Sequence, residues 1–183
     1  MINQETGRTM KHIIAFIALF SASTLAFDDP TYQFYGNSFS MAVPNEAKQL
    51  TPKALNKRFG NKNAPPQYAF SNKERNVSFT VTQYASPANK KSMRKIQMQL
   101  SAMLHQANPK AKWKKDKTSN KFGTKVAIFE YETKAVGKYQ YNITYALPVE
   151  DKLTLISFLI TDKKYKNKWV ELARTSFDSV QFN

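Results

Sequence analysis

Hydrophobic and polar residues alternate along several stretches of the chain, and this period of two predicts β-strands. The most regular stretch is residues 138–147, whose apolar positions are Tyr139, Tyr141, Ile143, Tyr145 and Leu147. Residues 153–160 are apolar on both faces, which is typical of a central strand covered on both sides. Residues 111–118 are rich in lysine and predict an edge strand, because a charged edge resists pairing with another chain. Further strands are predicted in two pieces of residues 32–43, broken at Gly36-Asn37, and at 67–70, 76–84 and 125–134.

A spacing of three to four residues predicts helices elsewhere. Residues 91–107 carry one apolar stripe, formed by Met93, Ile96, Leu100, Met103, Leu104 and Ala107. Pro109 favours a helix end just before it. Residues 165–180 have the same apolar spacing and predict a second helix. A short helix is predicted over 53–59, because Thr51 can cap a helix and Pro52 suits its first turn. Strand runs with helices between them predict an α+β fold, an antiparallel sheet sandwiched by helices.

The segment 10–26 has the pattern of a secretory signal peptide. Lys11 and His12 are followed by an eight-residue apolar run over 13–20, and small residues lead to a predicted cleavage site after Ala26. Such a run is too short to cross a bilayer core, which needs about 20 apolar residues. We therefore expect a signal peptide in 1–26, with translation starting at Met10, and a single exported domain over 27–183 that is periplasmic in a Gram-negative cell.

The chain is strongly basic, with 28 Lys and Arg against 13 Asp and Glu, a formal charge of +15. The basic residues gather in three segments, and these are the predicted partner-binding residues: Lys90, Lys91, Arg94, Lys95, Lys110, Lys112, Lys114, Lys115, Lys163, Lys164, Lys166 and Lys168. In a regular strand Lys110, Lys112 and Lys114 point to one face and form a stripe. A field of this sign attracts anionic partners and speeds their encounter.

Three interpretations of the basic segments stay open. They are solvated faces that protect an edge strand, a surface for an acidic protein partner, or a surface for an anionic membrane lipid or polysaccharide. Lysine dominates over arginine, and no ordered interleaving of arginine with aromatic residues suggests base stacking, which argues against nucleic acid. Among the binding functions, we favour an acidic protein partner.

Catalytic and metal chemistry have few candidate residues. The chain has no cysteine, which excludes disulfides and thiolate metal sites. Once 1–26 is removed, His105 is the only histidine, and we expect a boundary residue rather than a zinc ligand or catalytic base. Glu130 and Glu132 lie two apart on one strand, where we expect them to balance lysines rather than to act as an acid and base. We predict no enzyme, cofactor or metal, with a hydrolase using carboxylates or His105 as the alternative.

A tyrosine-rich strand face has two interpretations. Tyr139, Tyr141 and Tyr145 share one face, and Phe129 and Tyr131 lie on the neighbouring predicted strand. Such a face can be a binding platform, with apolar rings and hydroxyl groups at the rim. We favour a core position under a helix, because clean alternation is what burial alone produces.

Several segments together resemble the PsbP/DcrB/Mog superfamily. They are FSMAVP (39–44), NVSFTVTQYA (76–85), the helix 91–107, FGTKVAIFEYE (122–132), KLTLISFLITD (152–162) and SFDSVQF (176–182). The resemblance implies an α/β/α sandwich and a non-enzymatic binding, chaperone or assembly role. It therefore suggests an accessory protein of envelope or secretion functions, with toxin immunity as one form. The chain lacks the lipobox cysteine of the DcrB type, and no family site residues carry over.

Overall fold

The computed structural model describes residues 29–61, 63–135 and 137–183. The expected signal peptide 1–26 lies outside the described residues. Within them no helix is both long enough and apolar enough to cross a membrane. The elements follow in the order β1 (Thr31–Phe34), β2 (Phe39–Ala42), β3 (Lys48–Gln49), α1 (Pro52–Phe59), β4 (Tyr68–Ser71), β5 (Val77–Pro87), α2 (Met93–Ala107), β6 (Lys112–Lys121), β7 (Thr124–Ala135), β8 (Lys138–Val149), β9 (Lys152–Ile160), α3 (Lys166–Asp178) and β10 (Gln181–Phe182).

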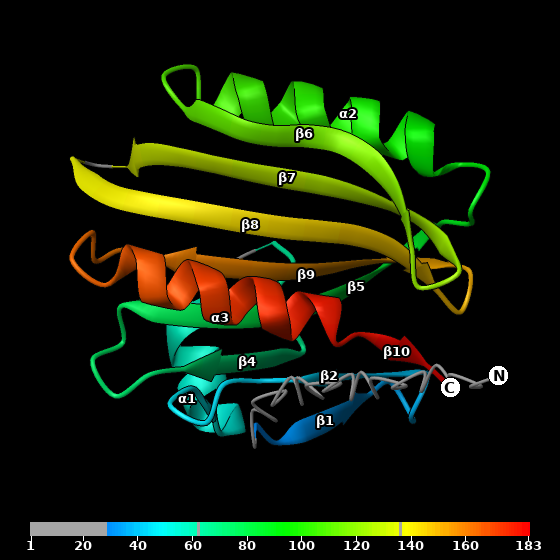
Figure 1. The fold of residues 1–183 in the computed structure, drawn as a ribbon. Coiled ribbons are helices and arrows are strands. Elements are labelled where there is room, and N and C mark those ends of the chain that lie inside the picture. The colour runs from blue at the N-terminus through cyan, green and yellow to red at the C-terminus, as the bar shows by residue number, and fades with distance from the viewer. Residues whose placement is uncertain (1–28, 62, 136) are drawn as a thin grey trace, which may run out of the picture.

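Seven strands form the main antiparallel sheet, in the order β3-β4-β5-β9-β8-β7-β6. The apolar strand β9 lies in the middle and the lysine-rich strand β6 lies at an edge, so both predicted positions are confirmed. The predicted cover on both faces of β9 is found in part: α3 covers one face, whereas on the other face Leu153 and Leu155 pack against the core under α2 and Ser157 and Leu159 line a groove. Strands β1, β2 and β10 form a second, three-stranded sheet beside the first (Figure 1). The predicted α+β class is confirmed.

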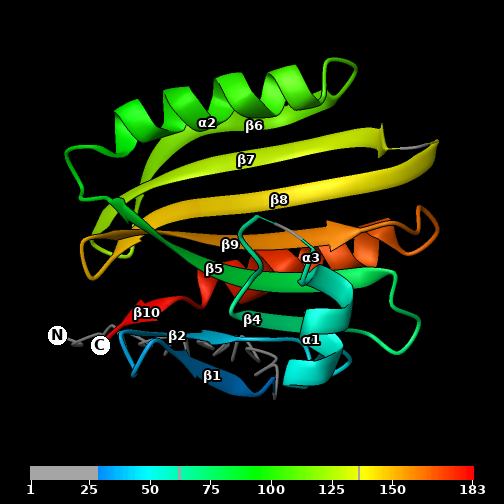
Figure 2. The same ribbon diagram turned by 180° about the vertical axis from the view of Figure 1, so that it is seen from behind.

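Helices cover both faces of the main sheet. Helix α3 packs on one face against β8 and β9 and also contacts β2, whereas α2 lies on the other face over β6, β7 and β8 (Figures 1 and 2). The larger core lies on the α3 side, where Phe177 packs against Phe79 and Tyr145 at ring-centroid distances of 6.4 and 4.9 Å. A smaller core on the α2 side is built around Met93 and Phe129. Helix α3 buries its apolar stripe, as the period of 3.6 requires. The stripe predicted for α2 is narrower than expected, because Met93 is buried and Ile96, Leu100 and Leu104 are half-buried, whereas Met103 and Ala107 are exposed.

The tyrosine-rich face belongs to the core. Tyr141 and Tyr145 are 4% and 5% exposed and lie in the cluster under α3, which confirms the favoured interpretation. Phe129 and Tyr131 do not extend this face. Glu130 pairs with Ile143 of that face, so its two neighbours on β7 point to the α2 side.

A bulge in β6 overturns one prediction about the lysines. Between Trp113 and Lys115 the register of β6 against β7 shifts by one residue. Lys112 faces Glu132 and Lys115 faces Glu130, so these two lysines share a face although they are three residues apart. The stripe of every second lysine that we expected from Lys110 through Lys114 is therefore interrupted.

The remaining differences concern the ends of elements. Strand β5 continues to Pro87, three residues beyond its predicted end, and β8 continues to Val149. Strands β3 and β10 were not expected, because two residues are too few to show a period. The cap of α1 is as predicted, with Thr51 Oγ1 accepting from Ala54 N at 3.3 Å.

Candidate interaction surface

Two of the three basic segments meet at one end of the main sheet. Lys110, Lys112, Lys134 and Lys163 line a hollow of about 550 Å³. We call these four lysines the basic end. Glu132, Thr133 and Tyr139 complete the lining. The sequence prediction included three of the lysines and missed Lys134, whose position across the hairpin from Tyr139 depends on strand register.

Chain direction explains why distant residues meet at the basic end. Three connections lie at the same end of the sheet (left in Figure 1). They join α2 to β6, β7 to β8, and β9 to α3. Antiparallel neighbours place every second connection at one end. Lysines at residues 110–112, 134 and 163 are thus brought together, although the chain separates them by up to 53 positions.

The basic end carries four ammonium groups and one carboxylate. Within the described residues, none of the four lysines has a carboxylate within 4.0 Å. Tyr139 donates a hydrogen bond to Glu132 at 3.4 Å. Burial, together with the charge of Glu132, raises the pKa of Tyr139 to about 12, so this tyrosine stays a neutral donor. With four ammonium groups and one carboxylate in its lining, the hollow keeps an excess of positive charge.

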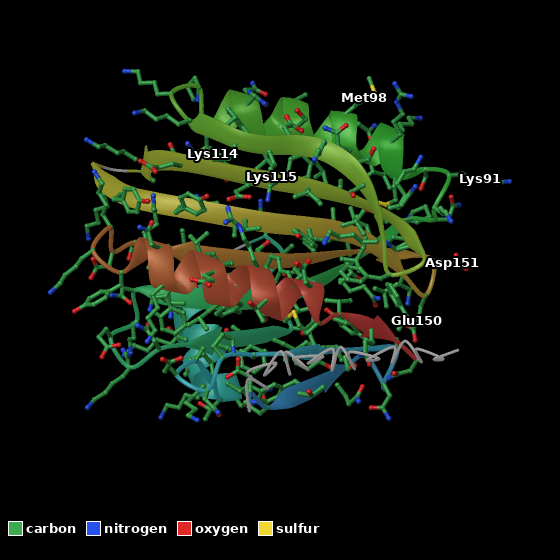
Figure 3. All side chains as sticks on the ribbon, viewed as in Figure 1. Lys91, Met98, Lys114, Lys115, Glu150 and Asp151 are labelled. Atoms are coloured by element: carbon green, nitrogen blue, oxygen red, sulfur yellow. The ribbon has the colours of Figure 1, made fainter. Side chains whose placement is uncertain are left out.

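The third basic segment lies at the opposite end of the sheet. Lys90 donates to the Gly123 carbonyl at 3.2 Å, and Lys91 precedes α2 at that end. Figure 3 places Lys91 near the β8–β9 turn, far from Lys114. Arg94 and Lys95 follow in the first turn of α2. The structure therefore separates this segment from the basic end.

The other predicted partner-binding residues have different environments. Lys115 forms an ion pair with Glu130 at 2.8 Å, and Lys168 forms one with Glu46 at 2.6 Å. Lys114 is exposed beside the bulge of β6 (Figure 3). The ammonium groups of Lys164 and Lys166 lie over the rings of Tyr165 and Tyr141, at 5.1 and 5.6 Å from the centroids.

Glu130 is the centre of a buried ion cluster. Its carboxylate, 1% exposed, receives Lys115 from β6, Arg174 from α3 and the hydroxyl of Tyr141 from β8. Burial acts to raise the pKa of Glu130, but the hydrogen bonds from Lys115, Tyr141 and Arg174 outweigh it, so its pKa is lowered. A carboxyl group that acts as a general acid needs a raised pKa, so the lowered pKa of Glu130 argues against that role. The cluster joins β6, β8 and α3 to one point of β7.

His105 belongs to a second polar cluster, between α2 and β6. Asp116 accepts from Gln97 and Ser101 and lies 2.9 Å from His105 Nε2, and the His105 ring stacks on Trp113 at 4.0 Å between centroids. In a Ser-His-Asp triad the imidazole lies between the hydroxyl and the carboxylate. Here the carboxylate lies between the hydroxyl and the imidazole. Over 29–61, 63–135 and 137–183, no group of three or more His, Asp or Glu residues is placed to hold a metal.

Solved structures with the same architecture place the chain among known folds. The cyanobacterial PsbP (CyanoP) from Synechocystis sp. PCC 6803 is 12% identical over 90% of this chain and 99% of its own, with a TM-score of 0.60. The Saccharomyces cerevisiae Ran-binding protein Mog1p is 11% identical over 86% and 96%, with a TM-score of 0.52. The chain has the PsbP/Mog1 fold. The resemblance inferred from the sequence is therefore confirmed at the level of fold.

The PsbP/Mog1 fold also occurs within longer chains. A protein from Bacteroides thetaiotaomicron is 12% identical over 85% of this chain and 48% of its own, with a TM-score of 0.52. No protein-family model and no curated protein sequence matches the chain. Identities this low define an architecture and leave function to be argued from the surface itself.

Proposed function

We propose that this protein is a non-catalytic binding protein that engages an acidic protein partner through the basic end, in envelope or secretion functions. One observation carries the proposal. Four lysines from three separate connections surround one hollow, and no described carboxylate pairs with them. Neutralising an exported toxin is one concrete form of such a role.

The physical basis is electrostatic complementarity. A cluster of unpaired ammonium groups steers an acidic partner toward one orientation and raises the association rate. The hollow adds shape, because a protruding acidic side chain or chain terminus can enter it. Mog1p, which has the same architecture, is described as a Ran-binding protein, and this supports protein binding as a use of the fold.

Paired charge reversals test the proposal. We expect Lys110→Glu with Lys163→Glu to weaken the complex with the acidic partner at least tenfold. The control, Lys91→Glu with Lys95→Glu, makes the same change in net charge at the other end and should retain binding. The complex is captured by affinity purification from cells that make the protein, and its Kd is measured at about 0.05 M and about 0.3 M salt.

Other outcomes would contradict the proposal. If both pairs weaken capture equally, net charge and not the basic end is responsible. If the wild-type protein captures nothing but sediments with phosphatidylglycerol vesicles in a manner that depends on Lys110 and Lys163, the partner is an anionic lipid surface. If affinity does not change with salt, the interaction is not driven by charge.

We also propose that the protein is exported. The support is the segment 10–26, with its short apolar run and small residues before Phe27. Fractionation followed by mass measurement should give a mature chain beginning at Phe27 in the exported fraction. Recovery of a chain that retains residues 10–26 from the cytoplasm would overturn this proposal.

A further inference from the structure

A second hollow lies on the opposite face from α3, on the part of the sheet that α2 leaves uncovered. Helix α2 contacts β6, β7 and β8, and α1 lies beyond β5 on the same side (Figure 2). Between them the sheet forms a groove of about 310 Å³. We call it the hydroxyl groove. It is lined by Phe59, Ala64, Pro66, Ser78, Thr80, Thr82, Tyr84, Asn142, Thr144, Leu155, Ser157, Phe158 and Leu159.

The lining of the hydroxyl groove combines polar and apolar side chains and is uncharged. Five of its side chains carry an aliphatic hydroxyl and one carries an amide, and no Lys, Arg, Asp or Glu is among them. A sheet face that merely meets solvent in a chain with 22% charged residues would be expected to include some of them. Ser78 and Thr82 are 4% and 8% exposed, so these hydroxyls are buried at the floor of the groove. The groove is a neutral site in a strongly basic protein.

One donor in the hydroxyl groove has no partner. The Nδ2 atom of Asn142 is buried and makes no hydrogen bond within the described residues. Thr144 and Ser157 hydrogen-bond each other across β8 and β9 at 3.0 Å, which leaves each hydroxyl oxygen with further acceptor capacity. The large majority of buried side-chain polar atoms in proteins are hydrogen-bonded, so the Asn142 amide has capacity for an acceptor on a bound molecule.

We propose that the hydroxyl groove binds a neutral saccharide of one or two rings. Its volume lies at the lower end of the range of small-molecule sites, about 300 to 1,000 Å³. The half-buried ring of Tyr84 supplies apolar surface for the C–H face of a sugar, and the hydroxyls and the Asn142 amide offer hydrogen bonds to its oxygens. A charged ligand would lose hydration without gaining a counter-charge from the lining.

Sugar titrations test this proposal. The probes are glucose, maltose, N-acetylglucosamine and N,N′-diacetylchitobiose, with glucose 6-phosphate as the charged comparison. We expect at least one neutral sugar to shift the Asn142 side-chain amide resonances at concentrations below about 50 mM, the range of weak binding sites. Glucose 6-phosphate should bind more weakly than glucose.

Matched variants separate ligand binding from folding. Asn142→Leu should lower the affinity for the sugar at least tenfold. It should not lower the melting temperature of the free protein, because the Nδ2 atom of Asn142 has no hydrogen bond in the described residues that the substitution would remove. Gln140→Leu is the control and should leave sugar binding unchanged. Gln140 lies two residues before Asn142 on the same face of β8 and is not part of the groove lining. Both variants should unfold cooperatively.

Three results would overturn the saccharide proposal. They are no resonance shift with any of the four neutral sugars, binding that Asn142→Leu leaves unchanged, and tighter binding of the phosphorylated sugar than of glucose. The basic end is a separate site, so Lys110→Glu with Lys163→Glu should leave sugar binding intact. Failure of one proposal is thus distinguishable from failure of the other.

Discussion

Replacing Glu130 with glutamine tests whether the buried ion cluster holds β6 and α3 to the sheet. Removing one partner of a buried ion pair costs about 3–5 kcal/mol. Lys115 and Arg174 have side chains that are 37% and 48% exposed, so both can regain water when the carboxylate charge is lost. We therefore expect Glu130→Gln to lower the free energy of unfolding by about 2 to 3 kcal/mol at pH 7, somewhat below the fully buried case.

The assay is urea unfolding at pH 7, supported by thermal melting. For a domain of this size each kcal/mol moves the melting temperature by about 2–4 °C, so a decrease of about 4 to 12 °C is expected. Glu132→Gln is the matched control, because Glu132 accepts only one long hydrogen bond in the described structure, from Tyr139. It should cost less than about 1 kcal/mol. A Glu130→Gln protein as stable as the wild type would refute the reasoning.

The same variant predicts a pH dependence. The pKa of Glu130 is lowered in the folded state from the usual value of 4.5, so its carboxylate stabilises the fold above that value. This contribution is lost as pH falls through the lowered folded pKa. The stability difference between wild type and Glu130→Gln should therefore be full at pH 7 and shrink below about pH 4.5. An equal difference at pH 7 and pH 3 would contradict the role of the charge.

Three further changes have defined outcomes. Asp116→Ala removes the acceptor of three α2 side chains, so we expect a loss of about 2 kcal/mol and faster amide exchange in α2. Phe177→Ala empties a fully buried site and should cost about 3–5 kcal/mol in urea unfolding, whereas Met98→Ala at a 63% exposed site should stay within about 0.5 kcal/mol. Asp151 has a left-handed backbone conformation, with φ 56°, which glycine adopts without strain. Asp151→Gly should therefore raise the free energy of unfolding by about 0.5 kcal/mol, and a lower free energy of unfolding would contradict this.

Much of the fold was predictable because secondary structure follows a local period. The apolar run of 153–160 became the central strand β9, and the stripe of 91–107 became α2 over Met93–Ala107. The lysine content of 111–118 predicted the edge position of β6. Each inference used only neighbours along the chain, where burial imposes a period of two or of 3.6 residues.

The sites were less predictable because they depend on register. The bulge at Lys114 put Lys115 on the face of Glu130, and no pattern in the sequence marks that extra residue. Glu130 looked like one of two similar carboxylates, yet only the packing of α3 brings Arg174 onto it. The alternation of 76–84 was recognised, but its polar half forms the floor of a groove only because α2 stops short of it.

The sequence by itself determined the class of fold, the order of the longer strands and helices and the excess of positive charge, since each follows from composition or from short-range periodicity. The tertiary structure decided which charges act together. Antiparallel neighbours bring Lys110, Lys134 and Lys163 to one end of the sheet and leave Lys91 at the other. It also separated a neutral groove around Asn142 from that basic end. The reason is physical: hydrogen bonds act over about 3 Å. Charges act over about 8 to 10 Å in physiological salt. Distance along the chain does not set the separation of such groups in space.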